Sequence, residues 1–132
     1  MKYMLDTNIC IFIMKNKIDV VNKYLANNHL GISISVITLA ELQHGVAKSL
    51  YIEEIEKNLA DFLIGFTVLD FDSGAAVEYG KICASLYKKG LPIGPMDMLI
   101  GAHAKSAGLT LVTNNTREFS RINGLHIEDW SE

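Results

Sequence analysis

The stretch Lys2-Tyr3-Met4-Leu5-Asp6 predicts a short apolar strand that ends at a carboxylate. Thr7 and Asn8 follow, and Asp, Thr and Asn are residues that start helices. The apolar run Ile9 to Met14 then predicts a helix directly after the strand. A strand that leads straight into a helix is the first half of an α/β unit.

The rest of the chain repeats this alternation. Apolar residues at helical spacing predict helices around residues 20–25 and over 36–49, 51–66, 73–89 and 98–107. Runs with strand character predict four more strands, at Gly31–Ser35, Thr67–Leu69, Leu109–Val112 and about Leu125–Ile127. The alternation predicts an α/β fold, a three-layer α/β/α arrangement with a mainly parallel central sheet, in a single domain over residues 1–132.

Composition narrows the functional classes. Hydrophobic residues make up 49% of the chain, which is enough for a buried core. No apolar run approaches the roughly 18 residues of a membrane-spanning helix, and the run Ile9 to Met14 is too short for a signal peptide. We therefore expect a cytoplasmic protein without membrane contact, in which Cys10 and Cys83 are buried free thiols. The net charge of −3 argues against a general nucleic-acid-binding module, but it allows a nuclease whose acids gather at a metal site.

Polar residues follow the predicted strands, where parallel sheets place their binding sites. Asp6 ends the first strand, and Glu41 lies one to two turns into the helix after the second. Asp97 is expected to open a helix after the proline-containing loop. Further polar residues follow the fourth strand, namely Thr113, Asn115 and Glu118. The four segments are therefore predicted to face one cleft.

Each acid also has an ordinary structural interpretation. Asp6 and Asp97 could simply cap helices, and Glu118 could be a first-turn acid favoured by the helix dipole. Glu41 is different because Ile37-Thr38-Leu39-Ala40-Glu41-Leu42 surrounds it with apolar side chains, where a carboxylate needs a partner or a cation. Several carboxylates in one place repel each other unless a cation neutralises them. Oxygen ligands without Cys or His favour Mg²⁺, with Mn²⁺ as an alternative, and such sites carry out phosphoryl chemistry.

Four short motifs resemble those of the PIN-domain ribonucleases and, within them, the VapC toxins of bacterial toxin–antitoxin pairs. They are Met4–Asn8, Thr38–Leu42, Pro92–Ile100 and Val112–Phe119. The closing stretch Gly124–Trp130 is also similar to the tail of enterobacterial VapC proteins. Each motif alone is short, but four in the right order with similar spacing over nearly the whole chain are specific.

The resemblance places Asp6, Glu41 and Asp97 on three acidic positions of the family. At the fourth position, where many PIN domains have Asp, the chain offers Asn114, Asn115 and Glu118. We place the acid at Glu118 and give Thr113 and Asn115 supporting roles. Asp6 and Asp97, which have short side chains, are expected to bind the metal directly.

The resemblance also implies a biological role. It implies the toxin component of a type II toxin–antitoxin system, a Mg²⁺-dependent endoribonuclease that cleaves tRNA, with initiator tRNA as the expected target. The implied partner is a VapB antitoxin whose chain blocks the cleft, and a homodimer that assembles with the antitoxin into a hetero-oligomer is expected. The predicted helix Tyr51–Phe66 carries more apolar residues than one small sheet need cover, so it is a candidate for these contacts. The alternative is that the whole stripe packs inside.

Two other functions compete with this interpretation. A nucleic-acid-binding module without catalysis would need a basic stripe, and its function would survive the loss of Asp6. A flavodoxin-like receiver domain would also gather acids around Mg²⁺, but it needs a Lys after a late strand, where this chain has Thr113-Asn114-Asn115. The four histidines lie in separate segments and are expected to serve packing or the surface.

Overall fold

A five-stranded sheet forms the centre of the computed structural model, which describes residues 1–132. Every neighbouring pair of strands in it is parallel. The strands lie in the order β3-β2-β1-β4-β5, so the first strand occupies the middle. Their bounds are β1 Tyr3–Leu5, β2 Ile32–Ser35, β3 Thr67–Leu69, β4 Thr110–Val112 and β5 Ile127–Glu128.

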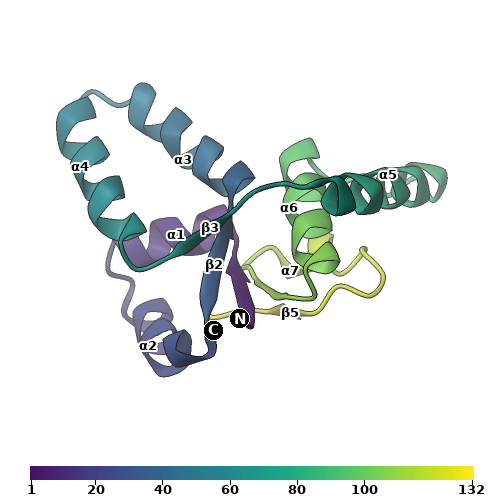
Figure 1. Cartoon of the computed structure of the whole chain (residues 1–132), viewed down its shortest axis with the longest axis horizontal. Coiled ribbons are helices and arrows are strands. Elements are labelled where there is room, and N and C mark those ends of the chain that lie inside the picture. Colours follow the sequence, from purple (N-terminus) through teal and green to yellow (C-terminus); the bar gives the residue numbers. More distant parts are fainter.

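The register of the sheet brings the ends of three strands together. Leu5 of β1 lies opposite Ile34 of β2 on one side and Val112 of β4 on the other. The residues that follow, among them Asp6 and Thr113, therefore lie along the same carboxyl edge. This edge is at the top of the sheet in Figure 1.

Helices cover both faces of the sheet (Figure 1). Their bounds are α1 Thr7–Met14, α2 Ile18–Asn27, α3 Val36–Ala47, α4 Ile52–Leu63, α5 Ser73–Lys88, α6 Pro95–Ser106 and α7 Thr116–Phe119, with a 3₁₀ turn at Asn28–Leu30. Tyr3 and Leu5 belong to one core cluster with residues of α1 to α4, whereas Met4 belongs to a second cluster with residues of α5, α6 and α7. Because strand side chains alternate between faces, this split marks the three layers.

The predicted α/β/α architecture is confirmed, and the sheet is wholly parallel rather than mainly so. The strand order also differs from the 2-1-3-4-5 order of flavodoxin-like folds, which removes the receiver alternative. Every helix falls short of the length and hydropathy that a membrane-spanning helix requires. Cys10 is buried and free as predicted, whereas Cys83, also free, is only half-buried.

Two predicted boundaries were wrong. The helix expected to start at Asp97 begins at Pro95, with Gly94 as its N-cap. Proline favours the first helical position because its fixed φ suits the helix and its missing N–H has no helical partner there. The last strand, expected at Leu125–Ile127, is instead the two-residue β5, because Gly124, with a φ of 81°, still belongs to the turn before it.

Candidate active site

Asp6 and Thr113 meet at the carboxyl edge because β1 and β4 are neighbours. Asp6 caps α1, since its Oδ1 accepts a hydrogen bond from the Thr7 backbone N–H at 2.8 Å. Its Oδ2 accepts from the Thr113 hydroxyl at 2.8 Å, and the Asp6 residue is only 4% exposed. The carboxylate is thus fixed in place by donors from two elements.

Glu41 projects from α3, which begins directly after β2 and is capped by Ser35. The Thr7 hydroxyl donates to Glu41 Oε1 at 2.6 Å and thereby joins α1 to α3. The buried Thr38 hydroxyl lies 3.3 Å from the same Thr7 oxygen. The sequence suggested that Glu41 needs a partner, and Thr7 is that partner; the carboxylate is half-buried rather than enclosed by apolar side chains.

Asp97 and Glu118 reach the cleft from the side of the sheet that α6 and α7 cover, and Asn115 links them. Asp97 lies in the first turn of α6 and Glu118 lies in α7. The Asn115 side chain donates to Glu118 Oε2 at 3.0 Å and to Asp97 Oδ2 at 3.4 Å. Its backbone N–H donates to the Thr113 hydroxyl at 3.0 Å, so the network continues to Asp6. Asn114 is not part of this network; its side-chain oxygen accepts a hydrogen bond from the Asn8 amide at 3.4 Å.

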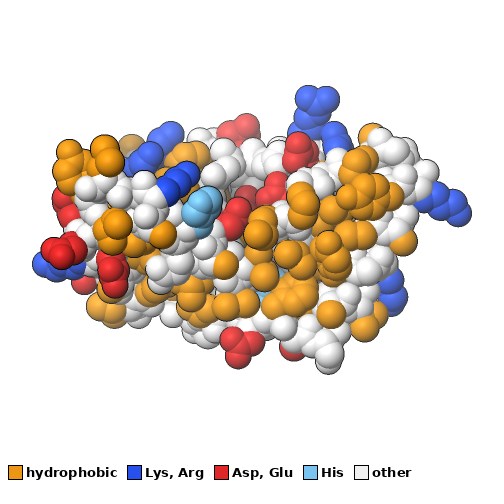
Figure 2. Space-filling model, turned by 90° about the horizontal axis from the view of Figure 1, so that it is seen from above, with side chains coloured by type: hydrophobic (Ala, Val, Ile, Leu, Met, Phe, Trp, Pro, Cys, Tyr) orange, Lys and Arg blue, Asp and Glu red, His pale blue; other side chains and the backbone are white.

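The structure therefore brings together all six residues predicted from the sequence, namely Asp6, Glu41, Asp97, Thr113, Asn115 and Glu118. Thr7 and Thr38 were missed. In the sequence, Thr7 follows a predicted strand, and a threonine in that position commonly does no more than start a helix. Viewed onto the carboxyl edge, Figure 2 shows acidic side chains in a hollow between two lobes of the surface.

The acids influence one another electrostatically. Burial raises the pKa of Asp97 to about 6, with further contributions from the charges of Asp6, Glu41 and Glu118, while the hydrogen bond from Asn115 lowers it. Burial also raises the pKa of Asp6, against hydrogen bonds from Thr113 and Thr7 that lower it, and Glu41 adds to the increase. The charge of Glu41 thus raises the pKa of both aspartates, whereas the charge of Glu118 raises that of Asp97.

No basic side chain offsets this negative charge. The single ion pair in the molecule joins Lys105 to Glu78, and none of the four acids forms one. The histidines behave as predicted: His103 is buried with its Nδ1 at 2.7 Å from the Ser35 hydroxyl, and the other three are exposed. The cleft therefore holds an excess of carboxylate charge with oxygen donors only.

Such a donor set fits a hydrated divalent cation. No three carboxylate, imidazole or thiolate groups converge tightly enough to form a complete cage by themselves. Mg²⁺ does not need such a cage, because it keeps several waters and is commonly held by one or two carboxylates. The uncompensated charge around Asp97 is the observation that favours a cation here.

Comparison with known proteins gives consistent matches. The PIN domain family matches residues 3–125. The tRNA(fMet)-specific endonuclease VapC of Shigella flexneri is 48% identical, over 99% of this chain and 99% of its own. The tRNA(fMet)-specific endonuclease VapC of Salmonella typhimurium is 49% identical, over 98% of each chain.

Solved structures agree. VapBC2 from Rickettsia felis bound to a DNA fragment from its promoter superposes with a TM-score of 0.94, at 42% identity, over 98% of this chain and 99% of that one. DNA-bound VapBC from Salmonella typhimurium gives a TM-score of 0.93 at 47% identity, over 98% of each chain.

Proposed function

Because this chain belongs to the PIN-domain family, we propose that it is the toxin of a type II toxin–antitoxin pair and a Mg²⁺-dependent endoribonuclease. The observation that carries the proposal is the gathering of Asp6, Glu41, Asp97 and Glu118 at one sheet edge without a basic partner. Near-full-length relatives that are named as ribonucleases support the reaction class.

Asp6 and Asp97 are the residues that would hold the metal. Both carboxylate oxygens of Asp6 already accept one hydrogen bond, and each retains a second lone pair. Asp97 is half-buried and has only the long contact with Asn115. Asp6 lies at the end of a strand and Asp97 at the start of a helix, so the backbone fixes how far each short side chain extends into the cleft. Mn²⁺ should substitute for Mg²⁺, because it also prefers oxygen ligands.

Glu41 would act on the attacking water. Thr7 holds Oε1, which leaves Oε2 to orient a water and accept its proton. The water oxygen then forms a bond to phosphorus while one phosphorus–ribose oxygen bond breaks. Bound Mg²⁺ supplies charge stabilisation at the phosphate and increases the acidity of water. Asn115 keeps Asp97 and Glu118 in place, and Glu118 acts through water on the Asp97 side.

The proposed substrate is tRNA, with initiator tRNA as the first candidate. This choice rests on the names of the Shigella and Salmonella relatives and their high identity over nearly the full chain. No residue described above selects one tRNA over another.

The proposed partner is a VapB antitoxin, since solved relatives are VapBC complexes. An apolar groove of about 420 Å³ between α1, α3 and α4 gives it a place to bind. Ile11, Leu42 and Ile55 line this groove, and Glu41 stands at its border. An antitoxin segment seated there would lie beside the acids and exclude RNA. On α4, Ile52 and Ile55 are exposed while Leu59 is buried, so only part of the predicted stripe packs inside. The homodimer stays a prediction.

Cleavage of purified tRNAs by the purified protein tests the proposal. Initiator tRNA should be cut in the presence of Mg²⁺ and should stay intact after exhaustive EDTA treatment, while an elongator tRNA should be cut more slowly. An antitoxin encoded next to the gene should suppress cleavage when added in equimolar amount. Full activity in EDTA would contradict the metal mechanism, and intact RNA under all conditions would contradict the ribonuclease.

A further inference from the structure

A second polar hollow lies between α5, α6 and the segment after α7. It has a volume of about 170 Å³, and three basic side chains line it, from Lys81, Lys105 and Arg121. Ser85 and Asn123 add a hydroxyl and an amide. A water molecule takes up about 30 Å³ of liquid volume, so the hollow has room for one phosphate group.

The charge of this region runs against that of the whole chain. The protein carries a net charge of −3, yet six of the eight charged residues between positions 81 and 121 are basic. The two acids among them are Asp97 and Glu118, which belong to the cleft. The positive charge is therefore concentrated in the part of the chain that also supplies Asp97 and Glu118.

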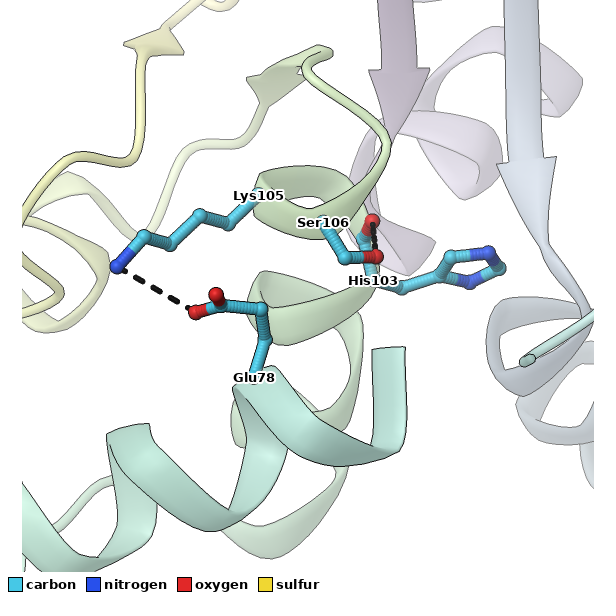
Figure 3. A network of polar contacts seen from close by, with 4 residues as sticks. All are labelled: Glu78, His103, Lys105 and Ser106. Carbon is cyan, nitrogen blue, oxygen red and sulfur yellow. Dashed lines mark hydrogen bonds and ion pairs between the residues drawn. The ribbon is translucent and has the colours of Figure 1, made fainter. Parts of the chain in front are cut away.

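One acid partly offsets the basic hollow. Lys105 Nζ lies 3.5 Å from Glu78 Oε2, as Figure 3 shows, and Lys105 leaves α6 on the side away from His103. The separation satisfies an ion pair, but this buried Glu78 oxygen has no hydrogen bond. Lys81 and Arg121 have no carboxylate partner. Two cationic groups therefore remain available to an anion.

The hollow and the acidic cleft are built from shared parts of the chain. Arg121 donates from Nη1 to the Pro92 carbonyl at 3.2 Å, and Pro92 belongs to the loop that leads into α6 and Asp97. The Arg121 backbone N–H also donates to the Glu118 carbonyl at 3.1 Å. α6 thus carries both Asp97 of the cleft and Lys105 of the hollow, and the segment that starts with α7 carries both Glu118 and Arg121. A guanidinium has five N–H donors, so Arg121 keeps others for a ligand.

We infer that this hollow binds a backbone phosphate of the RNA substrate, away from the phosphate that is cleaved. The inference rests on the proposed ribonuclease function and adds a second point of contact for the same strand. The acids repel the RNA backbone, so a neighbouring cationic site is needed to hold the strand across them. Lysine and arginine recognise phosphates through charge-assisted hydrogen bonds and the release of counterions.

Charge reversal at Lys81 tests the inference. Lys81 is exposed and has no ion pair, so Lys81→Glu should fold normally. The matched control is Lys57→Glu, an exposed position on α4 with the same change in net charge. Fluorescein-labelled initiator tRNA is titrated into each protein over a range of NaCl concentrations, in the slowly cleaving Glu41→Gln background. Cleavage constants are measured in the background of the unmodified Glu41.

We expect Lys81→Glu to weaken RNA binding roughly tenfold, as for the loss of one charged phosphate contact. The slope of log K against log salt should become shallower by about 0.7 to 1. KM should rise while kcat stays the same, and Lys57→Glu should change binding less than about twofold. Lys81→Ala should show the same pattern with a smaller loss.

Other results would overturn the inference in distinguishable ways. Cleavage by the parent protein together with unchanged binding by Lys81→Glu removes only the phosphate site. Equal losses in Lys81→Glu and Lys57→Glu would show a general charge effect without a site. Weaker antitoxin binding with intact RNA binding would assign the hollow to a protein contact. If the parent protein neither binds nor cuts RNA, the proposed function fails and this inference fails with it.

Discussion

Asp6, at the end of β1, is 4% exposed and held by two donors at 2.8 Å, whereas Asp97, in the first turn of α6, is half-buried and has one contact at 3.4 Å. Burial raises the pKa of both groups. At Asp6 two hydrogen bonds work against this increase, while at Asp97 the charges of three other carboxylates add to it.

The difference separates two roles in one site. Thr7 and Thr113 donate to the Asp6 carboxylate, so this group also stabilises the fold, in addition to its proposed role as a metal ligand. The start of α6 leaves Asp97 with charge that the protein does not neutralise, so a proton or a cation has to do so. We therefore expect Asp97 to be the position at which metal binding matters most.

The largest effect is expected from Asp97→Asn. The substitution keeps the shape of the side chain and an acceptor for Asn115 but removes the charge that would bind Mg²⁺. Single-turnover cleavage of initiator tRNA should fall by roughly 10³-fold or more, since metal catalysis contributes several kcal/mol. Asp61→Asn, an exposed position on α4, is the control and should cleave normally. Near-normal cleavage by a folded Asp97→Asn protein would remove Asp97 from the site.

Glu41→Gln should reduce turnover by roughly 10²–10⁴-fold, the usual contribution of a positioned base. The amide keeps an oxygen that accepts from Thr7, so the contact between α1 and α3 persists. Thr7→Val removes that contact together with the one to Thr38 and should produce a smaller loss. A Glu41→Gln enzyme of normal turnover would contradict the role of base.

Thr113→Val measures how much the hydrogen bond to Asp6 stabilises the protein. The valine has the shape of threonine but leaves Asp6 Oδ2 and the Asn115 backbone N–H without their partner. Unfolding in urea should show a loss of about 1–3 kcal/mol, the cost of unsatisfied buried polar groups. Thr110→Val serves as the control, because Thr110 lies in β4, three residues before Thr113. Equal stability of the two variants would show that the hydrogen bond between Thr113 and Asp6 does not stabilise the protein.

The smallest effect concerns pH and the stability of the metal-free protein. The folded-state pKa of Asp97, about 6, lies above its ordinary value of 3.8, so the folded protein holds this proton more tightly than the unfolded chain does. Stability from this group is therefore complete below about pH 4 and is lost as the pH rises towards 6. At pH 7 Asp97→Asn should exceed the parent by about 1 kcal/mol, after allowance for solvent screening of a half-exposed group.

Thermal unfolding at pH 4 and pH 7 checks this expectation. The advantage of Asp97→Asn should disappear at pH 4, and Mg²⁺ should stabilise the parent but not the variant at pH 7. An advantage that is equal at both pH values would have a cause other than the charge of Asp97.

The sequence was sufficient to predict that these acids meet, because the carboxyl ends of parallel strands share one edge. Asp6 and Thr113 follow from that rule directly. The start of α6 was missed by two residues because Gly94-Pro95 was assigned to a loop, although a proline at the first helical position is common. The contact of Thr7 with Glu41 spans 34 residues and depends on how α1 packs against α3. Neither helix encodes this packing by its own pattern.

The same reason explains why the roles of Asp6 and Asp97 could not be separated in advance. Both appeared as short acids at the start of a helix. Their distant hydrogen-bond partners are Thr113, directly after β4, for Asp6 and Asn115, directly before α7, for Asp97. The charge around Asp97 comes from three carboxylates that are far away in the sequence. The burial of these carboxylates and the charges around them arise only when the helices pack against the sheet.

Calorimetric titration of Mn²⁺ into the parent protein, Asp97→Asn and Glu41→Gln is the decisive test of the proposed metal site. The parent should bind one ion in the cleft, Asp97→Asn should show no binding at that site, and Glu41→Gln should bind with only a small change in affinity. If Asp97→Asn bound Mn²⁺ as tightly as the parent, Asp97 would not be the metal ligand. A loss of binding in Glu41→Gln as complete as in Asp97→Asn would contradict the division of roles and make Glu41 a direct ligand.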